Sequence, residues 1–302
     1  MKCNRVNIIL THRCNLNCKH CYMNASYNVD EDFDKIFLNA KQLLSTLFDD
    51  GINEIMFTGG ECTTFPRIVE LAKYAKDIGF NKVDIFTNGM ILNKELFDLV
   101  DTCYLSIDGL EHNHNFVRGN NNSFKNLLKT LDYLKETDKI TYLQFTANNH
   151  NINDLYDISK MLIDYLNVRK VKIVNQSNEG RAAGSELEPI DLYQIKEMLP
   201  VLYENTRYHI QFLCDLWSKY DVENYYLNNE IILPIWFDLV DNVYYIYCKD
   251  CFVKNINEID INELHNNLKD ISLEITNHFK TKLDQAYIDV ESTLANVFKK
   301  ED

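Results

Sequence analysis

The feature that most constrains the fold of this chain is an alternation of short apolar segments and longer amphipathic ones over its first two-thirds. A short apolar segment fits a buried parallel strand, and an amphipathic segment fits a helix that covers the sheet. The strand candidates are Val6–Leu10, Glu54–Phe57, Lys82–Phe86, Cys103–Ile107, Thr141–Thr146 and Lys170–Val174. Repeated strand–helix units of this kind predict a parallel α/β sheet with right-handed crossovers.

The number of units and a change of pattern near Ile190 predict the architecture. Six units are too few for a closed eight-stranded barrel, so we expect an open, partial (β/α)6 barrel. Beyond Ile190 a helix runs to about Glu204, a Tyr-rich strand-like stretch covers Ile231–Tyr247, and the end of the chain has a charged, helical pattern. We therefore predict a core over residues 1–200 and a small α+β extension over residues 201–302.

Composition narrows the classes of function. With 302 residues, 46% of them hydrophobic, the chain can bury a full core. Lys and Arg number 31 against 45 Asp and Glu, a net charge of −14, which disfavours nucleic acid as a partner and weakly favours a basic peptide. We see no signal peptide and no apolar segment long enough to span a membrane, so we expect a cytoplasmic protein. In that reducing compartment, clustered cysteines are typical of metal ligands.

Three cysteines follow directly on the first predicted strand. Cys14, Cys18 and Cys21 have the spacing C-x3-C-x2-C, which lets three thiolates bind three irons of a [4Fe–4S] cluster. The fourth iron then lacks a protein ligand, and an open coordination position indicates chemistry rather than structure. A zinc site would need a fourth ligand, which His12 or His20 could supply. The cysteines alone leave both metals open.

Glycine-rich and polar motifs stand where the next three predicted strands end. They are Thr58-Gly59-Gly60-Glu61, Thr87-Asn88-Gly89 and Ser106-Ile107-Asp108-Gly109. Glycines let the backbone approach a ligand closely, and a carboxylate can accept hydrogen bonds from an ammonium group. Each motif alone is an ordinary turn. Because parallel sheets gather their chemistry at the carboxyl ends of the strands, the motifs and the cysteines together predict one site.

With these motifs, residues 2–190 resemble the radical S-adenosylmethionine (SAM) superfamily. By that resemblance Cys14, Cys18 and Cys21 hold a [4Fe–4S] cluster. The resemblance assigns SAM contacts to Tyr22 near the adenine, Gly59, Gly60 and Glu61 at the amino group, Asn88 near the nucleoside, and Ser106 and Asp108 at the carboxylate or ribose. It implies that the reduced cluster passes one electron to SAM, and that a 5′-deoxyadenosyl radical then removes a hydrogen atom from the substrate. A flavodoxin or ferredoxin would supply the electron.

A second stretch resembles one branch of that superfamily. Asn113–Gly119, followed by Ser123 and Phe124, resembles the His-Asp-x-x-Arg-Gly…Ser-Phe signature of the peptide- and protein-modifying branch, which includes anaerobic sulfatase-maturing enzymes and maturases of ribosomally made peptides. Arg118 would pair with the SAM carboxylate, a bidentate task that suits a guanidinium. Gly180-Arg181-Ala182 also resembles that branch. The chain departs from it in having Asn115 for Asp and Cys62 for a common Pro.

Three further cysteines, Cys214, Cys248 and Cys251, fall in the expected extension, which resembles a SPASM or twitch auxiliary-cluster domain. The full set of seven cysteines is absent. Three alternatives stay open. The cysteines could hold one auxiliary [4Fe–4S] cluster, with Asp215 or Asp250 as fourth ligand; the domain could be degenerate and bind no metal; or one cysteine could donate a hydrogen atom or form a thioether.

The resemblance implies a radical SAM enzyme that modifies a ribosomally synthesised peptide by carbon–carbon or thioether crosslinking or by epimerisation. One alternative is a dehydrogenase or mutase that acts on a small metabolite. Another, of a different class, is a non-catalytic metal-binding interaction protein. Because the first cluster cysteine is already residue 14, we expect no N-terminal leader-binding domain. Cys62, next to the expected SAM site, could face the substrate.

Overall fold

The computed structural model describes residues 5–49, 51–214, 235–241, 243–246 and 253–255. Among these residues, no helix has the length and apolar character needed to cross a membrane.

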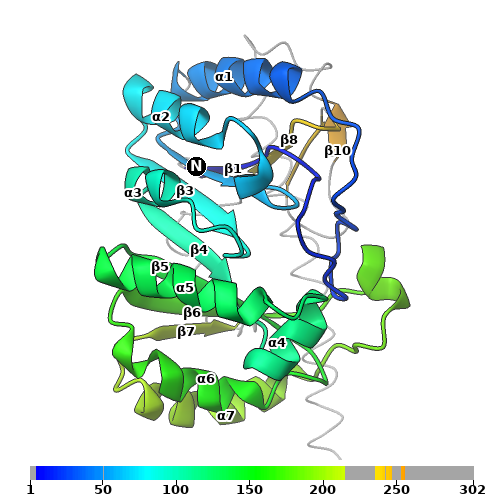
Figure 1. Cartoon of the computed structure of the whole chain (residues 1–302), viewed down its shortest axis with the longest axis vertical. Coiled ribbons are helices and arrows are strands. Elements are labelled where there is room, and N and C mark those ends of the chain that lie inside the picture. Colours follow the sequence, from blue (N-terminus) through cyan, green and yellow to red (C-terminus); the bar gives the residue numbers. More distant parts are fainter. Residues whose placement is uncertain (1–4, 50, 215–234, 242, 247–252, 256–302) are drawn as a thin grey trace, which may run out of the picture.

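One sheet forms the body of the molecule (Figure 1). Eight of its strands run parallel to their neighbours in the order β8-β1-β2-β3-β4-β5-β6-β7. Their bounds are β1 Arg5–Ile9, β2 Glu54–Thr58, β3 Lys82–Thr87, β4 Thr102–Ser106, β5 Thr141–Ala147, β6 Val168–Asn175, β7 Gln211–Cys214 and β8 Ile235–Asp238. Two antiparallel strands, β9 (Val243–Ile246) and β10 (Val253–Asn255), continue from β8. Within the described residues β7 and β10 do not pair, so the sheet stays open and the expected partial barrel is confirmed.

Most helices between the strands bury one apolar face, whereas α4 (Glu111–Arg118) buries His114 and Arg118 beside Val117. Their bounds are α1 Phe33–Asp49, α2 Ile68–Ile78, α3 Lys94–Leu99, α4 Glu111–Arg118, α5 Ser123–Glu136, α6 Asp154–Met161 and α7 Leu192–Asn205, with short 3-10 helices η1 Cys62–Thr64, η2 Leu162–Asp164 and η3 Gly180–Gly184. In α2, for example, Leu71, Ala72 and Ala75 lie on one face and are fully buried. Apolar residues repeated in this way explain why these segments fold as helices against the sheet.

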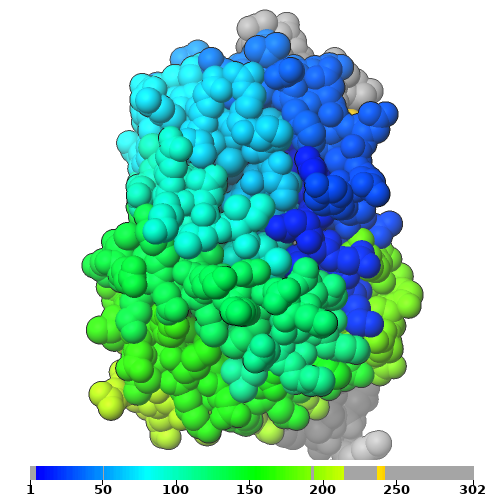
Figure 2. All heavy atoms as spheres, in the orientation of Figure 1, coloured from blue at the N-terminus to red at the C-terminus, as the bar shows by residue number. Residues whose placement is uncertain are grey.

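The segment after β1 lies along the carboxyl edge of the sheet. It leaves β1 at Leu10 and returns to the helix layer at α1. On the way it contacts α4, because the Lys19 amide donates to the Val117 carbonyl at 2.8 Å. Figure 2 shows the dark blue atoms of this segment next to the green atoms of the α4 region. The edge therefore brings the N-terminal cysteines to the ends of the other strands.

The six expected strands are present, each displaced by at most two residues at either end. The expectation missed that β7 and β8, both beyond residue 200, join the same sheet beside β6 and β1. Without them, β6 and β1 would be edge strands with unpaired backbone groups. The boundary near residue 200 stays a prediction. Most of residues 201–302, including Cys248 and Cys251, lies outside the described residues.

Candidate active site

Cys14, Cys18 and Cys21 lie in the loop that follows β1, all as free thiols. Cys14 and Cys18 are buried, and Cys21 is half-buried. The Cys14 amide donates to the Ser26 carbonyl at 2.8 Å, and the Cys21 amide donates to the Cys18 carbonyl at 3.2 Å. These bonds close the loop on itself, so the three side chains share one small region.

The spread of the thiols bears on which metal they could bind. Two thiolates on one tetrahedral zinc ion, each about 2.3 Å from the metal, lie about 3.8 Å apart. Among the described residues, His12, Asp238 and Asp241 form a group in which all ligand atoms lie within 4.8 Å of one another. The three cysteine sulfurs do not form such a group and are therefore farther apart. His12 Nε2 contacts Asp238 at 2.8 Å, so it is engaged away from the thiols. The arrangement favours a larger group, such as a cluster with a separate iron for each thiolate.

A small apolar shell surrounds the thiols. Leu16 and Ala25 are buried with Cys14 and Cys18, and Met23 and Met90 pack against them. This shell is separate from the main core under the helices. Apolar surroundings limit solvent access and so influence the redox potential of a bound metal group.

The sulfur atoms also receive hydrogen bonds. The Leu16 amide lies 3.4 Å from Cys14 Sγ, and Asn88 Nδ2, which also donates to Asn15 Oδ1 at 2.8 Å, lies 4.0 Å from it. Burial raises the pKa of the Cys14 thiol to about 12. Metal ligands must be thiolates, so donors near these sulfurs favour the form that binds metal.

Arg118, at the end of α4, lies between Cys18 and Asp108. Its Nη1 is 3.7 Å from Cys18 Sγ, and its Nη2 is 2.5 Å from Asp108 Oδ2. Burial raises the pKa of the Cys18 thiol, and the guanidinium opposes that rise. Burial also acts to raise the pKa of Asp108, but Arg118 and two neighbouring histidines hold it below its usual value. The site therefore holds an ionised, buried pair against one cysteine.

Two nitrogen atoms at this pair, one on Arg118 and one on the neighbouring His20, lack a hydrogen-bond partner among the described residues. Within the described residues, Arg118 Nε and His20 Nδ1 are buried and make no hydrogen bond. His20 Nε2 lies 3.5 Å from Asp108 Oδ2, and burial lowers the pKa of His20 to about 4, so the ring is neutral at pH 7. Buried polar groups normally have partners. A bound molecule with a carboxylate would satisfy Arg118 Nε, so this region fits the amino-acid end of a ligand such as SAM.

His114 links β4 to α5. The Asp108 amide donates to His114 Nδ1 at 3.1 Å, so the ring proton is on Nε2, which donates to Ser123 Oγ at 3.0 Å. Burial lowers the pKa of His114 to about 3, which keeps the ring neutral. The His and Ser of the branch signature thus fix the carboxyl end of β4, where Asp108 stands.

Glu61 joins the ends of β2 and β3. Its Oε1 accepts from the Thr63 amide (3.1 Å), Thr63 Oγ1 (2.7 Å) and Thr87 Oγ1 (2.6 Å), and its Oε2 accepts from the Asn88 amide at 2.6 Å. The side chain is buried. Because a carboxylate has about four acceptor sites, only Oε2 retains capacity for a further donor such as an ammonium group.

Gly60 permits a close approach of the β2 turn to the cysteine loop. Its amide donates to Thr11 O at 2.7 Å, and the Glu61 amide donates to Arg13 O at 2.8 Å. A Cβ on Gly60 would lie 2.6 Å from Arg13 O and 2.7 Å from His12 O. Any larger residue would push the turn away from the loop that carries the cysteines.

Gly180 and Arg181, in η3 after β6, contact the same loop from the other side. Gly180 has a φ of +55°, and a Cβ there would lie 2.2 Å from Tyr22 O. Arg181 donates through Nη1 to Cys18 O at 2.9 Å, through Nη2 to Ala25 O at 2.6 Å, and through its amide to the Cys21 carbonyl at 2.9 Å. Arg181 therefore fixes the backbone of the cysteine loop.

The structure brings most predicted site residues to one edge. Contacts connect Cys14 with Asn88 and Glu61 on one side, and Cys18 with Arg118 and Asp108 on the other.

The remaining predicted residues lie near this edge or outside the described part. Tyr22 is 42% exposed on the cysteine loop, and Ser106 is buried at the end of β4. Cys62 is fully buried and donates to Phe86 O at 3.2 Å, so it does not face a substrate. The side chains of Cys214, Cys248 and Cys251 lie outside the described part of the chain.

Two contributors were not predicted as members of the site. His20 was considered only as a zinc ligand, and Arg181 only as part of a family-like motif. The position of His20 between Cys18 and Cys21 was a usable signal, because it must share their loop. Nothing in the sequence pattern indicated that Arg181 contacts that loop.

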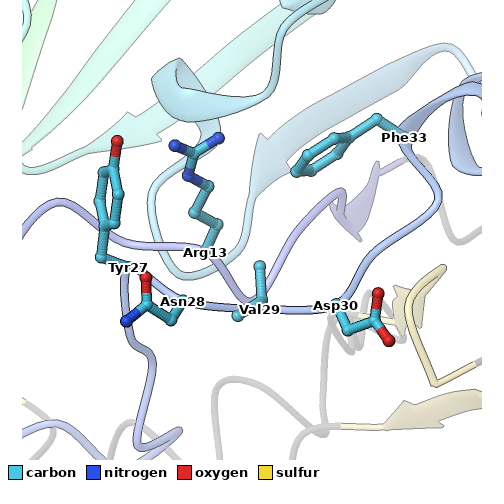
Figure 3. Close-up of a pocket in the computed structure, with 6 residues that line it drawn as sticks. All are labelled: Arg13, Tyr27, Asn28, Val29, Asp30 and Phe33. Carbon is cyan, nitrogen blue, oxygen red and sulfur yellow. The ribbon is translucent and has the colours of Figure 1, made fainter.

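A hollow of about 550 Å3 lies beside the cysteine loop (Figure 3). It is lined by Arg13, Tyr27, Asn28, Val29, Asp30 and Phe33. The Arg13 guanidinium lies 4.5 Å from the centroid of the Tyr27 ring, and Figure 3 shows both side chains pointing the same way. The hollow could accept a side chain of a larger ligand at the rim of the site.

Comparison with known proteins identifies the class. The sequence profile of the Radical SAM superfamily matches residues 8–162, about half of the chain, so the chain belongs to this superfamily.

Curated relatives match parts of the chain at 28–29% identity. The chain is 29% identical over 163 residues to the antilisterial bacteriocin subtilosin biosynthesis protein AlbA of Bacillus subtilis, a match that covers 51% of this chain and 36% of that protein. It is 28% identical over 203 residues to the Fe-coproporphyrin III synthase of Methanosarcina barkeri, covering 66% of this chain and 50% of that one. The chain thus spans half the length or less of these relatives.

Solved structures agree on the fold. SuiB of Streptococcus suis, bound to S-adenosylmethionine, matches with a TM-score of 0.68 at 14% identity, covering 87% of this chain and 65% of SuiB. SuiB bound to its precursor peptide SuiA matches with a TM-score of 0.66, also at 14% identity, over 87% of this chain and 64% of SuiB. At this identity the match supports the fold alone.

Proposed function

We propose that this chain reductively cleaves SAM at a [4Fe–4S] cluster held by Cys14, Cys18 and Cys21, and modifies a ribosomally synthesised peptide. The observation that carries the proposal is the burial of Cys14 and Cys18, in one loop with Cys21, beside the Arg118–Asp108 pair at the carboxyl edge of a radical SAM sheet. When bound, the cluster and SAM together supply the radical that removes a hydrogen atom from the substrate.

The chain's own residues would bind and orient SAM. Arg118 Nε, which has no partner among the described residues, suits the SAM carboxylate, with Ser106 and Asp108 nearby. Glu61 Oε2 retains capacity for the amino group. Nucleoside contacts would fall to Asn88 and Tyr22.

The surroundings of the thiols suit radical chemistry. Leu16, Met23 and Met90 form an apolar shell that limits solvent access to the sulfurs. His20 and His114 are neutral at pH 7, because burial lowers the pKa of each ring, and the proposed reaction needs no general acid or base at these positions.

The relatives and the hollow beside the cysteine loop support a peptide substrate. AlbA is named for the biosynthesis of a bacteriocin, and SuiB was solved with a precursor peptide. The hollow beside Arg13 could hold a peptide side chain. We include a flavodoxin or ferredoxin as electron donor, and an auxiliary cluster at Cys214, Cys248 and Cys251, in the same proposal.

The test combines two measurements. After anaerobic reconstitution with iron and sulfide, the enzyme with SAM and reductant should release 5′-deoxyadenosine, and Cys18→Ala should not. Co-expression with a short peptide encoded beside the gene should then change that peptide by mass spectrometry. Loss of two hydrogen atoms indicates a crosslink, and deuterium uptake from heavy water without other mass change indicates epimerisation. A chain that binds zinc and never releases 5′-deoxyadenosine would overturn the proposal.

A small metabolite is the second candidate, favoured by the similarity to an Fe-coproporphyrin III synthase. Release of 5′-deoxyadenosine together with an unchanged peptide would support it.

A further inference from the structure

Arg118 connects a cluster cysteine to a buried carboxylate. Arg118 is 7% exposed and Asp108 is fully buried. One guanidinium nitrogen lies 3.7 Å from Cys18 Sγ, and the other lies 2.5 Å from Asp108 Oδ2. Burying such a pair is costly, and an apolar pair of the same volume would often stabilise a fold at least as well. The position of the charge at the sulfur therefore calls for an explanation beyond stability.

The charges near the thiols are unevenly placed. The guanidinium reaches Cys18 directly, while the Asp108 carboxylate lies behind it, with Oδ1 accepting from the Thr146 amide at 2.9 Å. His20, beside Asp108, is neutral. Arg181 also contacts Cys18, but at its carbonyl oxygen. Within the described residues, the cationic side chain that donates a hydrogen bond to the sulfur of a cluster cysteine is therefore Arg118.

We propose that Arg118, oriented by Asp108, raises the reduction potential of the cluster through its hydrogen bond to the Cys18 sulfur. Reduction adds negative charge, part of which resides on the thiolate ligands. A fixed cation at one of these sulfurs stabilises the reduced state, and hydrogen bonds to cluster sulfurs are an established means of setting the potential. Asp108 acts with opposite sign, because its negative charge partly cancels that of Arg118. This inference rests on the proposed cluster at Cys14, Cys18 and Cys21.

The test is a reductive titration of the reconstituted cluster followed by electron paramagnetic resonance, without SAM or peptide. Arg118→Gln should lower the midpoint potential, changing the ratio of reduced to oxidised cluster at fixed potential about tenfold, or about 59 mV for one electron. Arg118→Lys keeps the charge and should lie nearer the wild type. Asp108→Asn should shift the potential upward.

Arg169→Gln is the control, because it removes a guanidinium from an exposed position of β6 and leaves the contacts of the cysteine loop unchanged. It should move the potential less than Arg118→Gln does. Equal potentials for the wild type and Arg118→Gln, or equal shifts for the Gln and Lys variants at position 118, would overturn the inference. If Asp108→Asn fails to fold, the comparison at position 118 still decides. Failure of the wild type to assemble any cluster would instead contradict the proposed function.

Discussion

Single buried side chains tie the strand ends together at this site. Glu61 accepts hydrogen bonds from groups on β3 and η1, and His114 joins the end of β4 to Ser123 of α5. In both residues nearly every polar atom has a partner, so a change of one atom leaves a buried donor or acceptor unpaired. Substitutions here should therefore affect stability as well as cofactor binding.

Glu61→Gln should lower the free energy of unfolding by about 1–3 kcal/mol. The amide nitrogen of Gln cannot accept a hydrogen bond. It should take the place of Oε2, which accepts one hydrogen bond where Oε1 accepts three, so the Asn88 amide loses its acceptor. Urea denaturation of the chain without cluster measures the loss. Glu70→Gln, at an exposed ion pair with Arg67, is the control and should change stability by less than about 1 kcal/mol. Equal losses would contradict the role given to Glu61.

The low pKa of His114, about 3 because of burial, predicts an acid sensitivity. The unfolded chain binds this proton near pH 6.5, whereas the folded chain resists it until about pH 3. The neutral ring therefore contributes stability above about pH 6.5 that is lost progressively as the pH falls toward about 3. His114→Asn, which can still accept from the Asp108 amide, should show a shallower decline. If the unfolding free energies of the wild type and His114→Asn fall in parallel from about pH 6.5 to about pH 4.5, this prediction is refuted.

At the scale of elements, the connections around the site are held by side chains of the short helices. Asn115 of α4 accepts from the Phe124 amide at 2.9 Å and donates to Asn121 O at 2.9 Å, so it caps the first turn of α5 from outside. The neutral amide performs both tasks, which explains how the chain tolerates Asn where the branch has Asp. In the same way η3 fixes the cysteine loop through Arg181.

Asn115→Ala should cost about 1 kcal/mol of stability, the usual loss for a helix cap. Asn115→Asp keeps the acceptor for Phe124 and adds a negative charge near the helix N-terminus, but loses the donor to Asn121. It should therefore cost less than Ala. Thermal unfolding of both variants decides, and a larger loss for Asp than for Ala would rule out the cap.

Arg181→Met should weaken metal retention more than it weakens the fold. It removes two charge-assisted hydrogen bonds to the carbonyls of Cys18 and Ala25, which position the loop backbone. The half-time of iron release to a chelator should fall several-fold, as expected when the groups that orient metal ligands are lost. Arg169→Met, at an exposed position of β6, is the control. Identical release from both variants would exclude the positioning role.

At the scale of the whole molecule, local patterns and non-local contacts differed in how far they could be predicted. Strand β2 and its Gly-Gly-Glu turn were readable because apolar runs and turn residues are local signals. The pairing of β8 with β1 was not, since it joins residues more than two hundred positions apart and β8 is short. Likewise Arg181 reaches Cys18 through the fold, and no spacing rule connects them. The topology of parallel sheets predicted which edge of the sheet carries the site. It did not predict which atoms contact one another at that edge.

The cysteines beyond residue 200 give the chain a testable second cluster. If Cys214, Cys248 and Cys251 hold an auxiliary cluster, the variant with Cys14, Cys18 and Cys21 all changed to Ala should retain iron and sulfide after anaerobic reconstitution. The variant with Cys214, Cys248 and Cys251 all changed to Ala should lose only the iron and sulfide of the auxiliary cluster. Iron and sulfide per chain, with the visible absorption of the iron–sulfur groups, measure both. Circular dichroism should show that the first variant stays folded, because all three N-terminal thiols lie outside the main helix-covered core. Complete loss of iron and sulfide from the first variant would mean that the chain carries one cluster, and that any substrate radical must be quenched without a second.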